Sequence, residues 1–397
     1  MKDAATLLSG KHIRLDALPP LALYVHIPWC VRKCPYCDFN SHAVRGELPE
    51  REYVAALTAD LEAALPLVWG RKVHTVFFGG GTPSLFSARA IDGLLAAIRA
   101  RLPLVPDAEI TLEANPGTFE AEKFAAYRAS GINRLSVGIQ SFDAQHLRDL
   151  GRIHDADEAR RAVGIALDCF DNVNLDLMYA LPRQTLEEAA RDVASAADYG
   201  VPHLSVYHLT LEPNTRFHHE PPPLPDDDTA AAMQERTQAM LAARGYAHYE
   251  VSAYARPGFE ARHNLNYWQF GDYLGIGAGA HSKISFADCI LRQVRHAGPA
   301  AYMEHAARGA AVLEQREVAM RDLPFEFMMN ALRLNVGFPT QLFEQRTGLP
   351  LTSIRCELDE AERRGFIVRD HLYIAPTELG RRFLNDLLQL FLHDPVG

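Results

Sequence analysis

Between about residue 21 and residue 250, short apolar runs alternate with longer stretches whose apolar residues recur at helical spacing. This alternation strongly limits the fold, because each apolar run needs cover on both faces and each amphipathic stretch needs a sheet to pack against. Six of the runs are expected to be parallel strands, at 21–27, 74–78, 108–114, 134–139, 172–178 and 203–209. The expected helices span 51–65, 87–102, 120–131, 155–170, 186–200 and 229–245.

Six strand–helix units predict an α/β protein with right-handed crossovers and a parallel sheet, either open or curled into a partial or complete TIM-like barrel. The proline-rich stretch 220–229 predicts a surface loop before the last helix. Residues 338–391 predict helices, a short hairpin and a final helix, similar to a winged helix-turn-helix. The expected organisation is an N-terminal segment (1–20), a core (21–250), a connecting region (251–300) and a C-terminal accessory domain (301–397).

The formal net charge of −10 disfavours nonspecific binding to nucleic acid or anionic lipid, since both would be repelled. Within 341–390, seven arginines and no lysine stand against eight acidic residues, so we expect this domain to pack against the core rather than to bind DNA. No apolar run reaches the length of a membrane-spanning helix, and the first twenty residues lack a signal-peptide pattern. We therefore expect a cytoplasmic protein.

Three of the six cysteines, Cys30, Cys34 and Cys37, lie within eight residues directly after the first expected strand. A structural zinc site normally has four ligands in two close pairs, and no second pair exists here. A redox pair would use Cys34 and Cys37 but would leave Cys30 without a role. Three thiolates on one short loop suit a [4Fe–4S] cluster with a fourth iron open to an exchangeable ligand. The other three cysteines are isolated and are expected to be ordinary buried residues.

The segment HIPWCVRKCPYCDFN (26–40) resembles the cluster loop of the radical SAM superfamily. That resemblance implies that the amine and carboxylate of S-adenosylmethionine (SAM) chelate the open iron. One electron from the reduced cluster then gives methionine and a 5′-deoxyadenosyl radical. The segment FFGGGTPS (77–84) resembles the part of the family that binds the methionine amine, and its glycines allow close approach of the backbone to a ligand.

Other residues are assigned roles by this resemblance, although a turn, a surface ion pair or a helix cap would explain them individually. Glu113 resembles the acceptor for the ribose hydroxyls, and Tyr36 could pack against the adenine ring. These residues follow strands, and barrel enzymes keep their chemistry at the carboxyl ends of strands. The residues expected to bind SAM and the cluster are Tyr24, Tyr36, Gly80, Gly81, Thr82, Glu113, Gln140, Arg152 and Asp176, with Cys30, Cys34 and Cys37 as the iron ligands.

Over essentially the whole chain, motifs such as LYVHIPWCVRKCPYCDFNSH, EANPGT and NLDLMYALPRQT resemble the family of oxygen-independent coproporphyrinogen III dehydrogenase. One branch of that family decarboxylates two propionates of coproporphyrinogen, and the other comprises haem chaperones. Three features favour the chaperone branch. Phe39 stands where the dehydrogenases have a further cysteine, only 23 residues precede Tyr24, and RHNLNYWQF (262–270) resembles a chaperone motif associated with haem binding.

In that motif His263 could offer an imidazole nitrogen to haem iron, while Tyr267 and Trp268 could stack on the macrocycle. A hydrogen-bonded core histidine is the plain alternative, and His281 is a second candidate ligand. We therefore predict a haem chaperone that binds a [4Fe–4S] cluster, SAM and haem.

The expected partners of such a chaperone are acceptor haem proteins, respiratory ones included, and an electron donor, with peripheral contact to membrane complexes. The alternatives are a coproporphyrinogen III dehydrogenase or a related porphyrinogen-directed oxidoreductase, and a structural or DNA-binding protein with a zinc loop.

Overall fold

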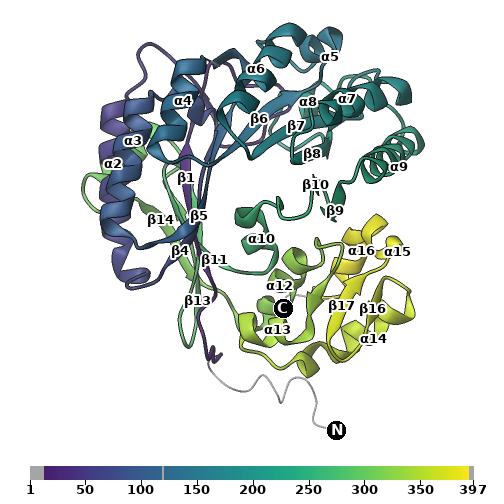
Figure 1. Ribbon diagram of the computed structural model, residues 1–397. Coiled ribbons are helices and arrows are strands. Elements are labelled where there is room, and N and C mark those ends of the chain that lie inside the picture. Colours follow the sequence, from purple (N-terminus) through teal and green to yellow (C-terminus); the bar gives the residue numbers. More distant parts are fainter. Residues whose placement is uncertain (1–12, 119, 393–397) are drawn as a thin grey trace.

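A twelve-stranded sheet dominates the computed structural model, which describes residues 13–118 and 120–392. Its strand order is β14-β13-β12-β11-β1-β4-β5-β6-β7-β8-β10-β9, so the sheet has two free edges and forms an incomplete barrel (Figure 1). The six central strands are parallel and confirm the expected positions. They are β1 (Leu21–Ile27), β4 (Val73–Gly80), β5 (Leu104–Ala114), β6 (Arg134–Gln140), β7 (Val173–Tyr179) and β8 (His203–His208).

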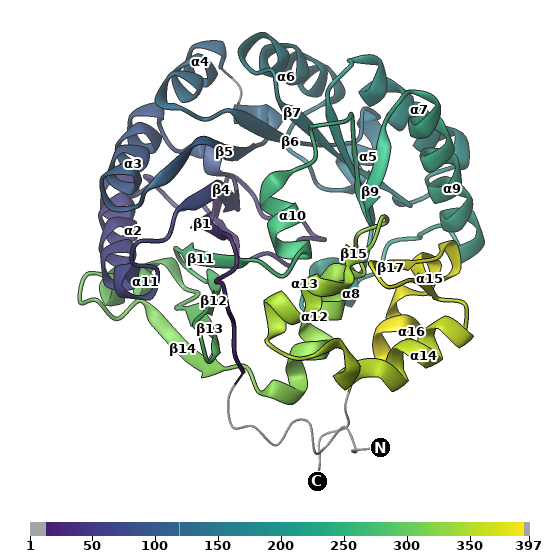
Figure 2. The ribbon, with the colours of Figure 1, turned by 60° about the horizontal axis from the view of Figure 1, so that its bottom comes forward.

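The predicted helices form a ring on the outer face of this sheet (Figure 2). They are α2 (Glu50–Ala64), α3 (Ala88–Arg101), α4 (Ala121–Ser130), α6 (Ala156–Cys169), α7 (Leu186–Asp198) and α9 (Asp227–Ala243). Local chemistry explains several of their ends. Asp155 and Thr185 begin α6 and α7 as capping boxes, in which side chain and backbone bond reciprocally. Gly131 ends α4 in the left-handed region that favours glycine.

The two faces of the parallel strands differ in character. In β6, Leu135, Val137 and Ile139 are completely buried in the core cluster that includes residues of the outer helices. Because side chains alternate along a strand, Ser136 and Gly138 face the inside of the barrel, where they contact polar groups. The interior is therefore polar near the carboxyl ends of the strands, unlike the packed apolar layers of an ordinary TIM barrel.

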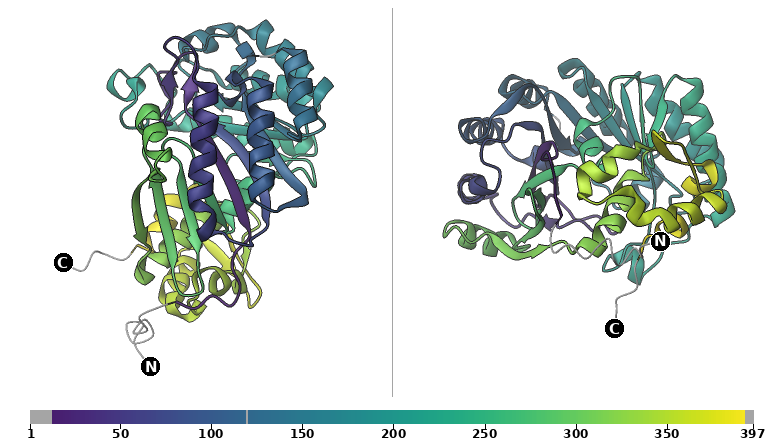
Figure 3. Two further views of the ribbon diagram at one scale, coloured as in Figure 1. Left: turned by 90° about the vertical axis from the view of Figure 1, so that its left-hand side faces the viewer. Right: turned by 90° about the horizontal axis from the view of Figure 1, so that it is seen from below.

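Both edges of the sheet are extended by strands that the sequence patterns did not predict. β11 (Asp272–Ile276) runs parallel to β1, and β12 (His281–Ser285), β13 (Ile290–Arg295) and β14 (Val312–Glu317) continue antiparallel beside α2 (Figure 3). β10 (Ala253–Ala255) and β9 (Ala247–Glu250) close the other edge. These strands are short, and several mix polar residues or glycine with apolar ones, so they give only a weak period-two signal.

Helix α10 (Arg262–Trp268) lies inside the curve of the sheet instead of on its outer face (Figure 2). It packs against β1, β4 and β11 and also against the C-terminal unit. The amides of Arg262 and His263 donate to the Glu109 carboxylate, at 3.1 and 3.0 Å, which fixes the first turn of the helix.

The C-terminal unit has a separate apolar core around Phe327, Phe338 and Phe343. The predicted helices and hairpin are confirmed, but two short helices follow the hairpin where a single final helix was predicted. Its elements are α12 (Leu323–Ala331), β15 (Phe338–Pro339), α13 (Thr340–Thr347), α14 (Arg355–Arg363), β16 (Ile367–Arg369), β17 (Tyr373–Pro376), α15 (Glu378–Arg382) and α16 (Leu384–Gln389). Within the described ranges, no helix has the length and apolar character required to span a membrane.

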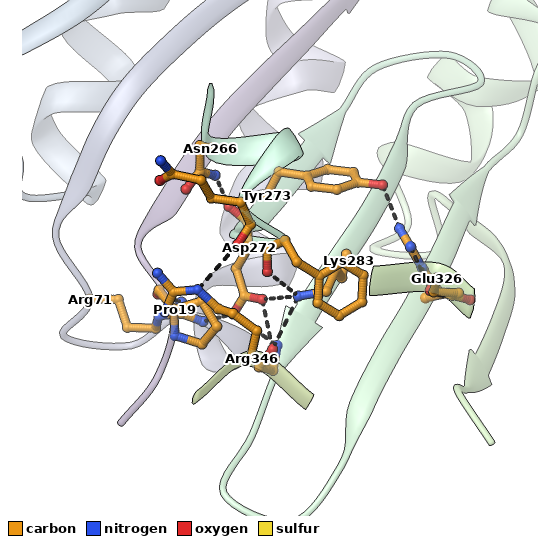
Figure 4. Close-up of polar contacts among 12 residues, drawn as sticks. Pro19, Arg71, Asn266, Asp272, Tyr273, Lys283, Glu326 and Arg346 are labelled. Carbon is orange, nitrogen blue, oxygen red and sulfur yellow. Dashed lines mark hydrogen bonds and ion pairs between the residues drawn. The ribbon is translucent and has the colours of Figure 1, made fainter. Parts of the chain in front are cut away.

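A buried cluster of charges lies in the sheet where the C-terminal unit packs against it. Asp272, at the start of β11, accepts a hydrogen bond from Lys283 at 2.9 Å and pairs with Arg71 at 2.8 Å (Figure 4). Burial alone would raise the pKa of Asp272, but the charges of Lys283 and Arg71 hold it below its usual range. Arg346 of α13 lies beside this pair and donates to the carbonyl of Gln269.

We expect Asp272→Asn to lower the free energy of unfolding by about 3 kcal/mol, because it leaves the ammonium of Lys283 buried without its counter-ion. Urea denaturation would measure the change. Glu304→Gln is the matched control, since Glu304 and Arg308 form an exposed pair whose loss should cost less than about 1 kcal/mol. Equal effects for the two substitutions would contradict the role given to Asp272.

Candidate functional site

The carboxyl ends of the parallel strands surround a cavity of about 340 Å³, which is within the size range of small-molecule sites. All three cysteines of the loop line it. Eight further residues predicted for the site line it too, and they come from the cysteine loop, from β4, β5, β6 and β7, and from the segments that follow β4 and α5 (Ala144–Asp149). They are Tyr36, Gly80, Gly81, Thr82, Glu113, Gln140, Arg152 and Asp176.

The cysteine loop is closed at its base by backbone pairing. β2 (Trp29–Cys30) pairs with β3 (His42–Ala43), so the loop leaves and returns at the same place. The amides of Gly81 and Thr82 donate to the carbonyls of Ile27 and Trp29, at 2.8 and 2.7 Å. A Cβ at Gly81 would lie 2.5 Å from the Trp29 carbonyl oxygen, so only glycine allows this approach. The glycine segment therefore supports the loop as well as lining the cavity.

Each of the three thiols has a polar partner. Thr82 donates to Cys30 Sγ at 3.5 Å, Arg152 donates to Cys34 Sγ at 3.5 Å, and the hydroxyl of Ser41 lies 3.7 Å from Cys37 Sγ. Burial raises the pKa of Cys30 and Cys37, while the bonds from Thr82 and Ser41 oppose that rise. Within the described ranges, no three His, Cys, Asp or Glu side chains converge as ligands of a single metal ion. A cubane cluster makes a different demand, because each thiolate holds a separate iron.

A hydrogen-bond chain connects two of the cysteines through residues that follow β4, β5 and α5. Asn115 donates to Thr82 Oγ1 at 2.8 Å and accepts from Arg152, and Thr82 and Arg152 in turn contact Cys30 and Cys34. Asn115 is not among the residues predicted for the site, although it lies in the motif EANPGT, two residues after Glu113. The parallel register of β4 and β5, which the structure shows, brings it beside Thr82.

Two carboxylates lie in the deeper part of the cavity. Asp176 accepts from Asn174 at 2.8 Å and from Ser136 at 3.1 Å, and burial raises its pKa. Glu113 accepts from the Gly80 amide at 3.1 Å. Burial and then the neighbouring charge of Asp176 raise the pKa of Glu113 to about 8. Glu113 is therefore largely protonated at neutral pH until a ligand or a cation favours its charge.

Gln140 ends β6 in a strained conformation. Its φ is +69°, in the left-handed region that non-glycine residues rarely adopt, at a cost of order 1 kcal/mol. Such strain is concentrated at functional sites because the surrounding structure must impose it. The side chain of Gln140 lies close to Gly138, where an added Cβ would be 3.1 Å from the Gln140 amide nitrogen.

Two tyrosines predicted for the site are placed differently. Tyr36 lines the cavity, and its ring also packs at 6.3 Å from the ring of Phe217. Tyr24 does not line the cavity; it lies one residue layer below, where its hydroxyl bonds to His26 Nδ1 at 3.0 Å. His26 Nε2 in turn bonds to the Asn40 carbonyl at 2.9 Å. His26 therefore links the hydroxyl of Tyr24 to the cysteine loop.

The residues predicted for haem, His263, Tyr267 and Trp268, do not line the cavity. His263 is 2% exposed, bonds through Nδ1 to Thr75 at 2.8 Å and stacks on a phenylalanine ring of β4. Burial lowers the pKa of His263 to about 3, so the ring is neutral. The Trp268 ring lies under the guanidinium of Arg333, at 4.2 Å. The alternative ligand His281 begins β12 and is exposed, also outside the cavity.

Comparisons with known families agree with this architecture. Residues 24–196 match the model of the radical SAM superfamily, and residues 318–383 match the HemN C-terminal domain. The solved structure of coproporphyrinogen III oxidase (HemN) from Escherichia coli, described as a radical SAM enzyme, superposes with a TM-score of 0.80. That match covers 98% of both chains at 24% sequence identity, so it supports the fold alone.

Two relatives found by sequence share a much higher identity with this chain than HemN does. The heme chaperone HemW of Escherichia coli is 52% identical over 380 residues, which cover 94% of this chain and 99% of the relative. The heme chaperone HemW of Haemophilus influenzae is 49% identical, covering 95% of this chain and 99% of the relative. With both domain matches, the shared fold and this identity over nearly the full length, the chain belongs to the HemW family of radical SAM proteins.

Proposed function

We propose that this protein is a haem chaperone, which binds haem and transfers it to acceptor haem proteins. The observation that carries the proposal is the 52% identity, over nearly the whole chain, to a relative named as a heme chaperone. Respiratory haem proteins are the acceptors we expect, with an electron donor for the cluster. The three cysteine thiols must stay reduced in order to bind metal, and this requires a reducing compartment. That requirement supports a cytoplasmic location.

We infer that Cys30, Cys34 and Cys37 hold a [4Fe–4S] cluster. The donor set fits, because the three thiols line one cavity and each has a hydroxyl or guanidinium partner that would stabilise a thiolate. When bound, the cluster would supply the electron that cleaves SAM. The protein's own contribution is to fix the loop, and Arg152 would offset part of the charge that three thiolates bring.

The remaining cavity residues are suited to SAM. The ionised carboxylate of Glu113 would accept from ribose hydroxyls, and Asp176 and Gln140 offer further polar groups at the same depth. Tyr36 lies beside the cysteines, where its ring can cover adenine. Gly80, Gly81 and Thr82 present backbone to the methionine end. Their proximity to the loop supports this orientation of SAM.

The haem ligands predicted in the HNLNYW segment stay a prediction. In this conformation His263 would reach a haem iron only after α10 moved, since its Nδ1 is bonded to Thr75 and its Nε2 is buried. The porphyrinogen-oxidising alternative would require chemistry on coproporphyrinogen, and Phe39 occupies the position of the further cysteine of that branch.

The decisive test of the chaperone function is a haem titration of the anaerobically reconstituted protein, followed by the Soret band. We expect saturation near one haem per chain, and subsequent transfer to a haem-free acceptor. An anaerobic incubation with reductant, SAM and coproporphyrinogen III should leave the porphyrinogen unchanged. Formation of the two-carboxyl product, without saturable haem binding, would overturn the chaperone proposal in favour of the dehydrogenase.

Alanine at Cys30, Cys34 or Cys37 should abolish most of the bound iron and acid-labile sulfide, because each thiolate holds one iron of the cluster. Cys169→Ala, Cys289→Ala and Cys356→Ala serve as matched controls and should keep both. Colorimetric iron and sulfide analysis after reconstitution would measure the outcome. Zinc without sulfide in the wild-type protein would refute the cluster assignment.

SAM affinity should rise as pH increases from 7 to 9 and then level off, because ribose hydroxyls donate to the ionised form of Glu113, whose pKa is about 8. The change can reach about tenfold, which is the gain in the ionised fraction over that range. Equilibrium dialysis with the reconstituted protein would measure it. Glu113→Gln should bind SAM more weakly and with a flat profile; an unchanged profile in that variant would assign the titration to another group.

A further inference from the structure

We propose that haem binds across the mouth of the cavity, on an apolar collar formed by Val31, Phe39 and Ile153. This inference rests on the proposed function, since it assumes that the protein binds haem, and it adds where. The collar lies at the carboxyl ends of the strands, beside the cysteine loop and away from the HNLNYW segment on α10.

Several apolar side chains around the mouth of the cavity are exposed to solvent. Val31 is 52% exposed, Phe39 61% and Ile153 47%, and all three line the same cavity. Tyr207, at 41%, lines it from the β8 side. Single exposed apolar side chains are ordinary, but a group of them around one opening indicates a binding surface.

A porphyrin suits the collar better than SAM does. The groups suited to SAM, such as Glu113 and Asp176, are polar and lie deeper in the cavity. SAM is small and charged, so it has no need of an apolar rim. A porphyrin is flat, wide and largely apolar, and its faces favour contact with aromatic and aliphatic side chains. Haem is thus the ligand of this family's chemistry that matches the collar.

Positive charge beside the collar suits the propionates of haem. Haem carries two propionates, and the exposed side chains of Arg32 and Lys33 follow Val31 directly on the loop. Arg32 bonds to the Gly151 carbonyl and Lys33 to the Phe39 carbonyl at 3.1 Å, which leaves other N–H donors of both groups available. The mouth of the cavity therefore carries two cations, although the whole chain has a formal net charge of −10.

Acidic groups restrict how haem can be oriented. Asp38 and Glu212 also line the cavity, and they would repel the propionates. Pairing of the propionates with Arg32 and Lys33 is the arrangement that offsets this repulsion.

His263 is not accessible to haem iron in this arrangement, because it already bonds to Thr75 and is buried inside the barrel. His208 does not replace it: its ring packs against Tyr179 of the outer core, and side chains alternate along β8, so it points away from the face on which Tyr207 contacts Asp176. The collar and its two cations, rather than an iron ligand, therefore define the proposed site.

The test uses full-length, anaerobically reconstituted protein titrated with haem. We expect the double variant Phe39→Ser/Ile153→Ser to raise the Kd for haem at least tenfold, with wild-type iron and sulfide content as evidence of an intact cluster loop. Leu313→Ser, at an exposed position outside the cavity, is the matched control and should leave the Kd unchanged. Arg32→Ser/Lys33→Ser should weaken haem binding, because it removes the two cations proposed to pair with the propionates.

The outcomes separate the two proposals. No saturable haem binding by the wild-type protein would refute the chaperone function itself. Wild-type affinity in the Phe39→Ser/Ile153→Ser variant would overturn the collar alone. Loss of the haem spectrum only in His263→Asn would place the haem at α10 instead. A change of oligomeric state at constant haem affinity would make the collar a contact between copies of the chain, and would also overturn the proposal.

Discussion

The hydrogen-bond chain from Cys30 to Cys34, through Thr82, Asn115 and Arg152, is the constraint on which the cavity depends. Its members follow β4, β5 and α5, and they meet only because the parallel strands end along one edge. A satisfied network of this kind holds one arrangement, since breaking any bond leaves a partly buried polar group without a partner. The geometry of the cysteine loop is thus set by the register of the sheet as much as by the loop's own residues.

The same network explains why the glycine segment and the loop cannot vary independently. Gly81 approaches the Trp29 carbonyl too closely for any side chain, and its neighbour Thr82 bonds to Cys30. The loop, the glycine turn and the end of β5 therefore form a single rigid wall. Tyr24 and His26 extend this support beneath the loop, which gives Tyr24 a structural position although it does not face the cavity.

Much of this arrangement could be predicted from the sequence, because strand periodicity is local and carboxyl ends of parallel strands share an edge. The resemblance to radical SAM proteins assigns Cys30, Glu113, Arg152 and Asp176 to one site, while periodicity alone predicts only that Glu113 and Asp176 lie at strand ends; all four line one cavity. The contacts of Asn115 could not be predicted, since its partners lie 33 and 37 residues away and are set by register. Short edge strands such as β12 gave no clear alternation.

Residues of α10 illustrate a different limit. An amphipathic or aromatic helix looks the same in sequence whether it lies outside a barrel or within it. His263 was considered either as a ligand or as a core residue, and its bond to Thr75 and its full burial depend on the tertiary fold. The choice between those interpretations therefore needed the structure.

The cavity lies at the carboxyl ends of the parallel strands, and the proposed collar surrounds its mouth. A wide ligand bound at that mouth would block access to any ligand bound beneath it. Binding would then follow a fixed order, with SAM first and the wide outer ligand second. The products of SAM would stay in the cavity until the outer ligand dissociated. Delivery of the outer ligand and renewal of the inner one would be coupled by geometry alone, without a moving lid.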